Sequence, residues 1–148
     1  MAPPGGAGSR RPRTVIALGW AGMLPFAALA GLAWLPTVPP DAVDRLFLIY
    51  ALAITAFLSG TLWGRASDVT GAGKTVRLCA SNGFVLVGAF ALAFAETRVA
   101  ATVFLLLFWA ILLFEWRVAG QRGWYLRYRL QLTVAVSLFH ALFIAAPR

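Results

Sequence analysis

The sequence has few charged residues, and this scarcity excludes an ordinary soluble domain. Of its 148 residues only 12% are charged and 61% are apolar, with a mean hydropathy of +0.80. An average soluble domain is about one-quarter charged, and a chain this short cannot hide so much apolar surface in one core. We therefore expect lipid, not water, to surround most of the chain.

Cysteine, histidine and acidic residues are also rare. The single cysteine, Cys79, excludes an internal disulfide. One histidine and five carboxylates form no group with the spacing of metal ligands, and neither a Ser-His-Asp arrangement nor paired intramembrane carboxylates occur. We expect no catalytic residues, no metal site and no cofactor.

The net charge of +8 raises nucleic acid as a partner, but the placement of the cations argues against it. The basic residues stand in short clusters between apolar runs instead of along one face. Membrane proteins distribute cations in this way, and the clusters fix their orientation. We expect membrane lipid as a partner, and no nucleic acid.

Five apolar runs follow a polar N-terminal tail. The tail, residues 1–13, contains three prolines, three glycines and three arginines, which predicts a disordered basic segment. A helix of about 20 residues crosses the hydrocarbon core, and only helices or closed barrels satisfy the backbone there. The sequence predicts an all-α membrane domain over 14–148, a bundle of five transmembrane helices at approximately 14–35, 46–63, 78–95, 99–116 and 130–146.

The cations predict how this domain is oriented. Ten of the thirteen lysines and arginines lie in the tail and in the second and fourth connections between the apolar runs, which the five crossings place on one side of the membrane. The other side has only Arg45, Arg98 and Arg148. The positive-inside rule then predicts a cytoplasmic N-terminus and, after five crossings, a C-terminus outside. The first run also imitates a cleavable signal peptide, with small residues at 28–30. Its continuation through Leu35 is long enough to span the membrane and favours an uncleaved helix.

Three segments resemble a known family. Leu24-Pro25-Phe26 lies in the first run, Gly60 to Gly64 closes the second, and Trp124-Tyr125, followed by arginines, opens the fifth. With these motifs the chain resembles the domain of unknown function 3429 family of small integral membrane proteins, which includes a mitochondrial transmembrane protein of animals. The resemblance implies a multi-pass inner-membrane protein and supplies no activity. We expect this chain in a bacterial inner (plasma) membrane.

Polar side chains within the runs are candidate binding residues, because each costs free energy in lipid unless it has a partner. Six of them lie toward the cytoplasmic ends of three predicted helices, where one hydrogen-bonded cluster is possible. Such a cluster serves either to bond helix to helix or to bind a ligand or ion. The six residues are Ser59, Thr61, Ser81, Asn82, Gln131 and Thr133.

A second candidate site lies toward the outer leaflet and comprises Tyr50, Ser137 and His140. Thr133, Ser137 and His140 follow at steps of four and three, so they share one face of the last helix. We expect this face to point into the bundle, with His140 at about the depth of Tyr50. A lone histidine without co-ligands favours a packing role over a metal or haem ligand or a proton relay.

Two features predict the shapes and contacts of the helices. Pro25 cannot donate a backbone hydrogen bond to Ala21, which predicts a kink, with a hinge or substrate notch as its functional interpretation. Small residues on the second helix recur at steps of three, four and four and predict close packing against another helix. These small residues are Ala53, Ala56, Gly60 and Gly64.

The last connection combines arginines with aromatic residues. Such juxtamembrane segments bind anionic lipid or anchor the chain at the membrane interface. Glu115, at its start, is expected either to pair with Arg122 or to face water. The predicted anchor residues are Arg117, Arg122, Trp124, Tyr125, Arg127 and Arg129.

These features predict a noncatalytic membrane protein that binds lipid or another membrane protein and assists the assembly of a larger complex. The alternative is a small transporter or channel that uses the polar cluster and the break at Pro25. Five helices are few for a pore, so that function requires a homo-oligomer. A redox or haem-handling role depends on His140 alone.

Overall fold

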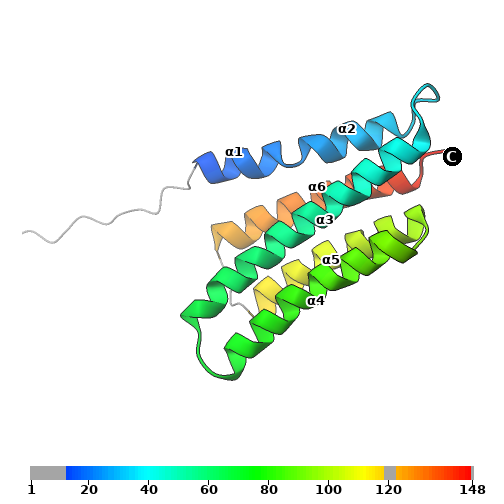
Figure 1. Cartoon of the computed structure of the whole chain (residues 1–148). Coiled ribbons are helices and arrows are strands. Elements are labelled where there is room, and N and C mark those ends of the chain that lie inside the picture. The colour runs from blue at the N-terminus through cyan, green and yellow to red at the C-terminus, as the bar shows by residue number, and fades with distance from the viewer. Residues whose placement is uncertain (1–12, 119–122, 148) are drawn as a thin grey trace, which may run out of the picture.

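The chain folds into an antiparallel bundle of long helices, shown in Figure 1 as a computed structural model. The structure describes residues 13–118 and 123–147. Over these two ranges it contains helices and connecting turns but no strand, which confirms the all-α prediction. The predicted tail, apart from its last residue, and Arg122 lie outside the described residues.

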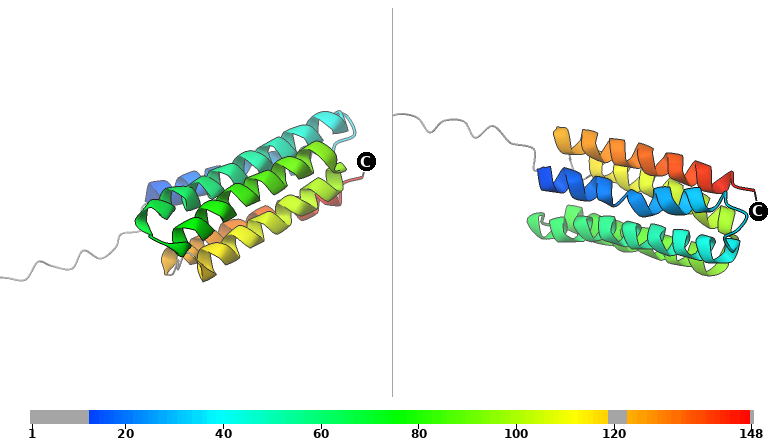
Figure 2. Two further views of the ribbon diagram at one scale, coloured as in Figure 1. Left: turned by 60° about the horizontal axis from the view of Figure 1, so that its bottom comes forward. Right: turned by 90° about the horizontal axis from the view of Figure 1, so that it is seen from above.

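The helices run nearly parallel to one long axis in all views (Figures 1 and 2). The first pass consists of two shorter helices placed end to end, α1 and α2, and each later pass is one long helix. A short 3₁₀ helix, η1, follows the second pass. The elements are α1 (Arg13–Ala21), α2 (Leu24–Leu32), α3 (Pro40–Gly64), η1 (Arg65–Asp68), α4 (Ala72–Phe94), α5 (Thr97–Arg117) and α6 (Trp124–Ile144).

Four segments are long and apolar enough to cross a membrane: Arg13–Leu32, Pro40–Ser67, Ala72–Phe94 and Thr97–Arg117. The last helix, α6, has 21 residues, as α5 does. Its first turns carry Arg127, Arg129 and Gln131, however, so its apolar part is shorter. The structure therefore supports a membrane protein with four clear candidate spans, and a fifth crossing by α6 stays a prediction.

Three helices begin earlier than the apolar runs predict. The second pass starts at Pro40 instead of residue 46, α4 at Ala72 instead of 78, and α6 at Trp124 instead of 130. A proline in the first turn costs no hydrogen bond, because that N–H has no partner within the helix. Gly71 and Gly123, which precede the other two helices, have φ of +67° and +80°, a conformation that favours glycine. The apolar runs predict which part of each helix lies in the hydrocarbon. Pro40, Gly71 and Gly123 determine instead where the helices begin.

The first pass breaks where Pro25 predicts a kink. Gly22 and Met23 separate α1 from α2, and Pro25 is the second residue of α2, where its missing N–H is tolerated. The hydroxyl of Tyr50 on α3 donates a hydrogen bond of 2.8 Å to the carbonyl oxygen of Gly22. A neighbouring helix thus satisfies a backbone acceptor at the break, as membrane interiors require.

Aromatic rings from four helices form the centre of the bundle. Phe26 of α2 packs edge-on against Phe47 of α3 at 5.4 Å and against Phe108 of α5 at 6.1 Å, measured between ring centroids. The ring of Phe47 stacks on Phe143 of α6 at 3.7 Å. His140 of α6 also lies in this cluster, 4.8 Å from Phe47. These buried contacts hold the broken first pass against α3, α5 and α6.

Within residues 13–118 and 123–147, no other helix packs against the small-residue face predicted on the second helix. A Cβ atom added at Gly60 or Gly64 would meet nothing within 4 Å. The close approach occurs instead at Gly88 of α4, where an added Cβ would lie 2.8 Å from the ring of Phe104. The spacing of residues in the sequence shows which side chains share one face of a helix. It does not show which other helix, if any, packs against that face. The exposed residues of the predicted face are Ala53, Ala56, Gly60 and Gly64.

Candidate functional site

Most of the described cations lie at one end of the bundle. The C-terminal ends of α3 and α5 meet the N-terminal ends of α1, α4 and α6 there (Figure 1). At the opposite end, the described cations are Arg45 and Arg98. The fold therefore has the charge asymmetry that the sequence predicts. The cations of the basic end are Arg13, Arg65, Lys74, Arg77, Arg117, Arg127 and Arg129.

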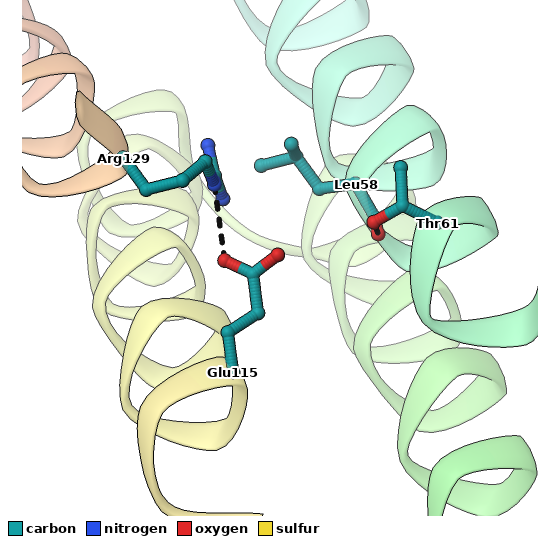
Figure 3. A network of polar contacts seen from close by, with 4 residues as sticks. All are labelled: Leu58, Thr61, Glu115 and Arg129. Atoms are coloured by element: carbon teal, nitrogen blue, oxygen red, sulfur yellow. Dashed lines mark hydrogen bonds and ion pairs between the residues drawn. The ribbon is translucent and has the colours of Figure 1, made fainter. Parts of the chain in front are cut away.

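A buried ion pair joins α5 and α6 near this basic end. The Nε of Arg129 donates a hydrogen bond of 3.0 Å to Oε2 of Glu115, and the two side chains are only 8% and 1% exposed (Figure 3). The alternative in which Glu115 faces water is wrong, because the side chain is buried. The other alternative, a pair with Arg122, involves a residue outside the described ranges. Because α5 and α6 are antiparallel neighbours, a residue near the end of one helix faces a residue near the start of the other.

The guanidinium of Arg129 has further N–H donors besides Nε, which donates to Glu115. A guanidinium carries five N–H groups, and the Nη2 atom of Arg129 is buried without a hydrogen-bond partner among the described residues. In Figure 3 the side chain of Leu58 on α3 points toward this guanidinium, which lies above the carboxylate of Glu115 in that view. Sequence reasoning placed Arg129 among the exposed interface anchors and missed its burial. The sequence does contain a signal for this ion pair. Glu115 lies near the end of one predicted helix and Arg129 near the start of the next, so their depths are similar.

Two adjoining cavities lie beside Arg129, and together we call them the α1–α3 groove. Their volumes are about 110 and 320 Å³. The groove has α1 on one side and α3 on the other, and α6 forms its floor. Among the residues that line either cavity, Arg129 alone is charged. The residues shared by both cavities are Leu18, Gly19, Phe57, Leu58, Arg129 and Leu132.

The wall formed by α1 rests on α6 through few contacts. No residue of α1 is buried. The hydroxyl of Tyr128 donates to the carbonyl oxygens of Val15 and Ile16, at 3.1 and 2.9 Å. A Cβ added at Gly19 would collide with this hydroxyl, so only glycine allows the helices to approach here. The short α1 is thereby held beside α6. The space between α1 and α3 remains as the groove.

Three of the six polar residues predicted to cluster donate hydrogen bonds to their own helices. The hydroxyl of Thr61 donates to the carbonyl of Leu58 at 2.7 Å. Both Ser81 and Asn82 donate to the carbonyl of Leu78, each at 2.9 Å. Serine and threonine readily make such bonds to the preceding turn, which satisfies them in lipid without a partner helix.

The other three residues of the predicted cluster differ in burial. Ser59 is buried, and its hydroxyl has no hydrogen-bond partner among the described residues. Thr133 is buried and lines the smaller cavity of the groove. Gln131 is exposed, as is Asn82. The structure therefore places Thr61 and Thr133 at the groove but does not gather the six residues into one site.

The residues of the predicted outer site have separate partners. Tyr50 donates to Gly22 at the break in the first pass. The hydroxyl of Ser137 donates to the carbonyl of Thr133 at 2.7 Å and accepts from Nε1 of Trp109 at 3.0 Å. These bonds connect α3 to the break in the first pass and α5 to α6, and they do not converge on a common ligand position.

His140 is fully buried, as its helical face predicts. Its Nδ1 lies 2.9 Å from the carbonyl oxygen of Val136, and its Nε2 has no hydrogen-bond partner among the described residues. The rings of Phe26, Phe47 and Phe108 surround it, with centroids at 5.2, 4.8 and 5.5 Å. Within the described ranges no group of three or more metal-ligating side chains forms. The ring therefore packs among aromatic side chains, and the choice between a packing role and a ligand or relay role stays a prediction.

Four of the predicted interface anchors lie at the basic end of the bundle, and their role at a membrane interface stays a prediction. Arg117 and Arg127 are exposed, and the guanidinium of Arg117 lies over the ring of Trp116 at 5.2 Å. Arg65 lies over the ring of Tyr125 at 5.7 Å. Trp124 and Tyr125 are half-buried at the start of α6. A cation held over an aromatic ring is attracted by the electron density of the ring face.

The family model for proteins of unknown function, DUF3429, matches residues 11–145. The chain belongs to this family. The match covers the whole described bundle of this DUF3429 protein except its last two residues, so the groove and the ion pair both lie within it. No curated protein and no solved structure matches the chain. The resemblance carried by the motifs at Pro25, Gly60 and Trp124 is confirmed.

Proposed function

We propose that this protein is a noncatalytic, multi-pass membrane protein that binds a membrane lipid in the α1–α3 groove. The observation that carries this proposal is an apolar groove whose one charged lining residue, Arg129, is buried. Leu18 and Phe57, at its rim, are 68% and 69% exposed. Because the rim is apolar and belongs to helices of membrane length, lipid has direct access to it.

The proposed threading has five crossings, with α6 as the fifth, the N-terminus in the cytoplasm and the C-terminus outside. The cations at one end of the bundle support this orientation, since the cytoplasmic side of a membrane protein carries more arginine and lysine. For a bacterial chain this corresponds to the inner membrane. The bound lipid is then on the cytoplasmic leaflet, because the groove lies toward the basic end.

A lipid-binding role has more support than transport through a pore. The transporter hypothesis requires the six polar residues to converge, whereas Thr61, Ser81 and Asn82 bond to their own helices. We also expect the lipid-bound protein to associate with another membrane protein or a second copy. Crosslinking in native membranes followed by mass spectrometry tests this association, and a chain that is never crosslinked would contradict it.

The lipid-binding proposal is tested by filling the groove. Leu18→Trp puts a large ring into both cavities, whereas Ala17→Trp makes a comparable change at an exposed neighbour that lines neither. Native mass spectrometry of gently solubilised protein should find lipid bound to the wild type and to Ala17→Trp but largely lost from Leu18→Trp. Equal lipid retention by both variants, or no bound lipid on the wild type, would overturn the proposal.

A further inference from the structure

We propose that Arg129 recognises the phosphate of a phospholipid headgroup, an inference that rests on the lipid-binding function above. In this arrangement Nη2 of Arg129 donates to a phosphate oxygen while an acyl chain lies along the α1–α3 groove. The ligand of the groove is then specifically a phosphodiester lipid, and not any apolar molecule of suitable size.

The guanidinium of Arg129 has a buried donor, Nη2, that a ligand in the groove can use. Glu115 accepts from Nε of Arg129 at 3.0 Å, and the buried Nη2 has no partner among the described residues. A buried donor without an acceptor costs free energy. Arg129 lines both cavities of the groove, so an acceptor that enters there can meet its guanidinium. Phosphate oxygens match the planar geometry of a guanidinium well.

The charges around the groove favour an anionic acceptor. Glu115 neutralises Arg129, which allows the guanidinium to stay buried when no ligand is bound. A second cation stands near the larger cavity, because Arg65 lies over the ring of Tyr125, which lines that cavity. Arg77 donates to the carbonyl oxygen of Arg65 at 3.3 Å and adds positive charge nearby. Because the Arg129–Glu115 pair is neutral overall, the positive charge for an anionic headgroup comes from Arg65 and Arg77 at the basic end of the groove.

The groove also has the polarity gradient of a phospholipid. Its larger cavity, toward the basic end, is lined by Thr61, Tyr125 and Tyr128. Its smaller cavity reaches Phe108 and Val136 toward the middle of the bundle. Val136 lies seven positions after Arg129 on α6, a rise of about 10 Å. A headgroup at Arg129 thus has room for the first part of an acyl chain along α6.

The experiment compares ligands that share acyl chains but differ in the headgroup. Purified protein, stripped of lipid in a mild detergent, is mixed with phosphatidylglycerol, phosphatidylcholine, diacylglycerol or inorganic phosphate, and binding is measured by native mass spectrometry. We expect both phospholipids to bind about tenfold more tightly than diacylglycerol, the effect of one charge-assisted hydrogen bond. Binding of inorganic phosphate with no phospholipid preference would overturn the lipid assignment.

The variants remove the guanidinium without leaving a buried charge alone. Glu115→Leu with Arg129→Leu removes both partners, and Arg129→Lys keeps a cation beside Glu115 but lacks the planar fork. Both should lose most of the preference for phosphate yet still bind diacylglycerol. The matched control, Arg127→Gln, removes an exposed charge on the same helix outside the groove and should keep the preference.

The outcomes separate this inference from the function on which it rests. An unchanged phosphate preference in the double variant and in Arg129→Lys would overturn the role of Arg129, while groove binding would stand. A loss of preference in Arg127→Gln equal to that in the double variant would assign the effect to the surface charge and overturn the inference. Absence of all lipid binding in the wild type would instead reject the proposed function itself.

Discussion

The hydroxyl of Tyr50 lies 2.8 Å from the carbonyl oxygen of Gly22, so α3 holds the first pass at the point where it breaks. Gly22 and Met23 also line the smaller cavity of the groove. The ring of Tyr50 packs edge-on against Phe26, with 4.9 Å between centroids. One side chain therefore connects the break, the aromatic core and the wall of the α1–α3 groove.

Removal of the Tyr50 hydroxyl should weaken this connection. Tyr50→Phe keeps the ring but leaves the Gly22 carbonyl without its donor, and we expect a loss of about 1 kcal/mol in unfolding free energy. Tyr125→Phe is the matched control, because it also removes a tyrosine hydroxyl but its ring lies under Arg65, away from the break in the first pass. SDS titration in mixed micelles measures both variants. Equal losses would contradict the role of the bond.

The ion pair between Glu115 and Arg129 predicts strong coupling. Either Glu115→Leu or Arg129→Leu alone leaves a buried charge without its partner and should cost about 3–5 kcal/mol, whereas the double variant should be close to the wild type. A double-mutant cycle of unfolding free energies in mixed micelles measures the coupling. Additive losses in the double variant would show that the two side chains do not interact in the folded protein.

Two glycines should respond differently to a larger side chain. Gly88→Leu forces atoms into the ring of Phe104 and should cost about 1–3 kcal/mol, whereas Gly60→Leu meets open space on the same chain. Melting temperatures of the monomer in detergent compare the two variants. A destabilisation by Gly60→Leu as large as that by Gly88→Leu would contradict the exposed position of the small-residue face.

The hydrogen bond of His140 predicts the tautomer of its ring. The carbonyl of Val136 only accepts hydrogen bonds, so the nitrogen 2.9 Å away, Nδ1, must carry the hydrogen. We expect ¹⁵N NMR to show a protonated Nδ1 and a bare Nε2. His140 is the one histidine of the chain, which makes the assignment direct. Signals of the opposite tautomer would show that the ring makes a different contact.

Properties that depend on local composition could be predicted from the sequence. The scarcity of charge predicts membrane helices, Pro25 predicts the break in the first pass, and the cation clusters predict the basic end. The helical spacing of Thr133 and His140 predicts that both are buried. Each of these inferences needs only one segment, because the chain itself determines hydropathy, backbone donors and the helical face.

The candidate site depends on contacts between segments, and only the tertiary structure decided those. Whether Glu115 meets Arg129 depends on the depth and rotation of α5 relative to α6. Whether Gly60 or Gly88 packs closely depends on which helix lies opposite. The groove exists because the short α1 rests on Tyr128 instead of filling the space beside α3. The sequence by itself therefore determined that the chain forms apolar helices of membrane length and that the cations gather at one end of the bundle. The partners of each polar side chain were decided by the packing of helices, which no single helix encodes.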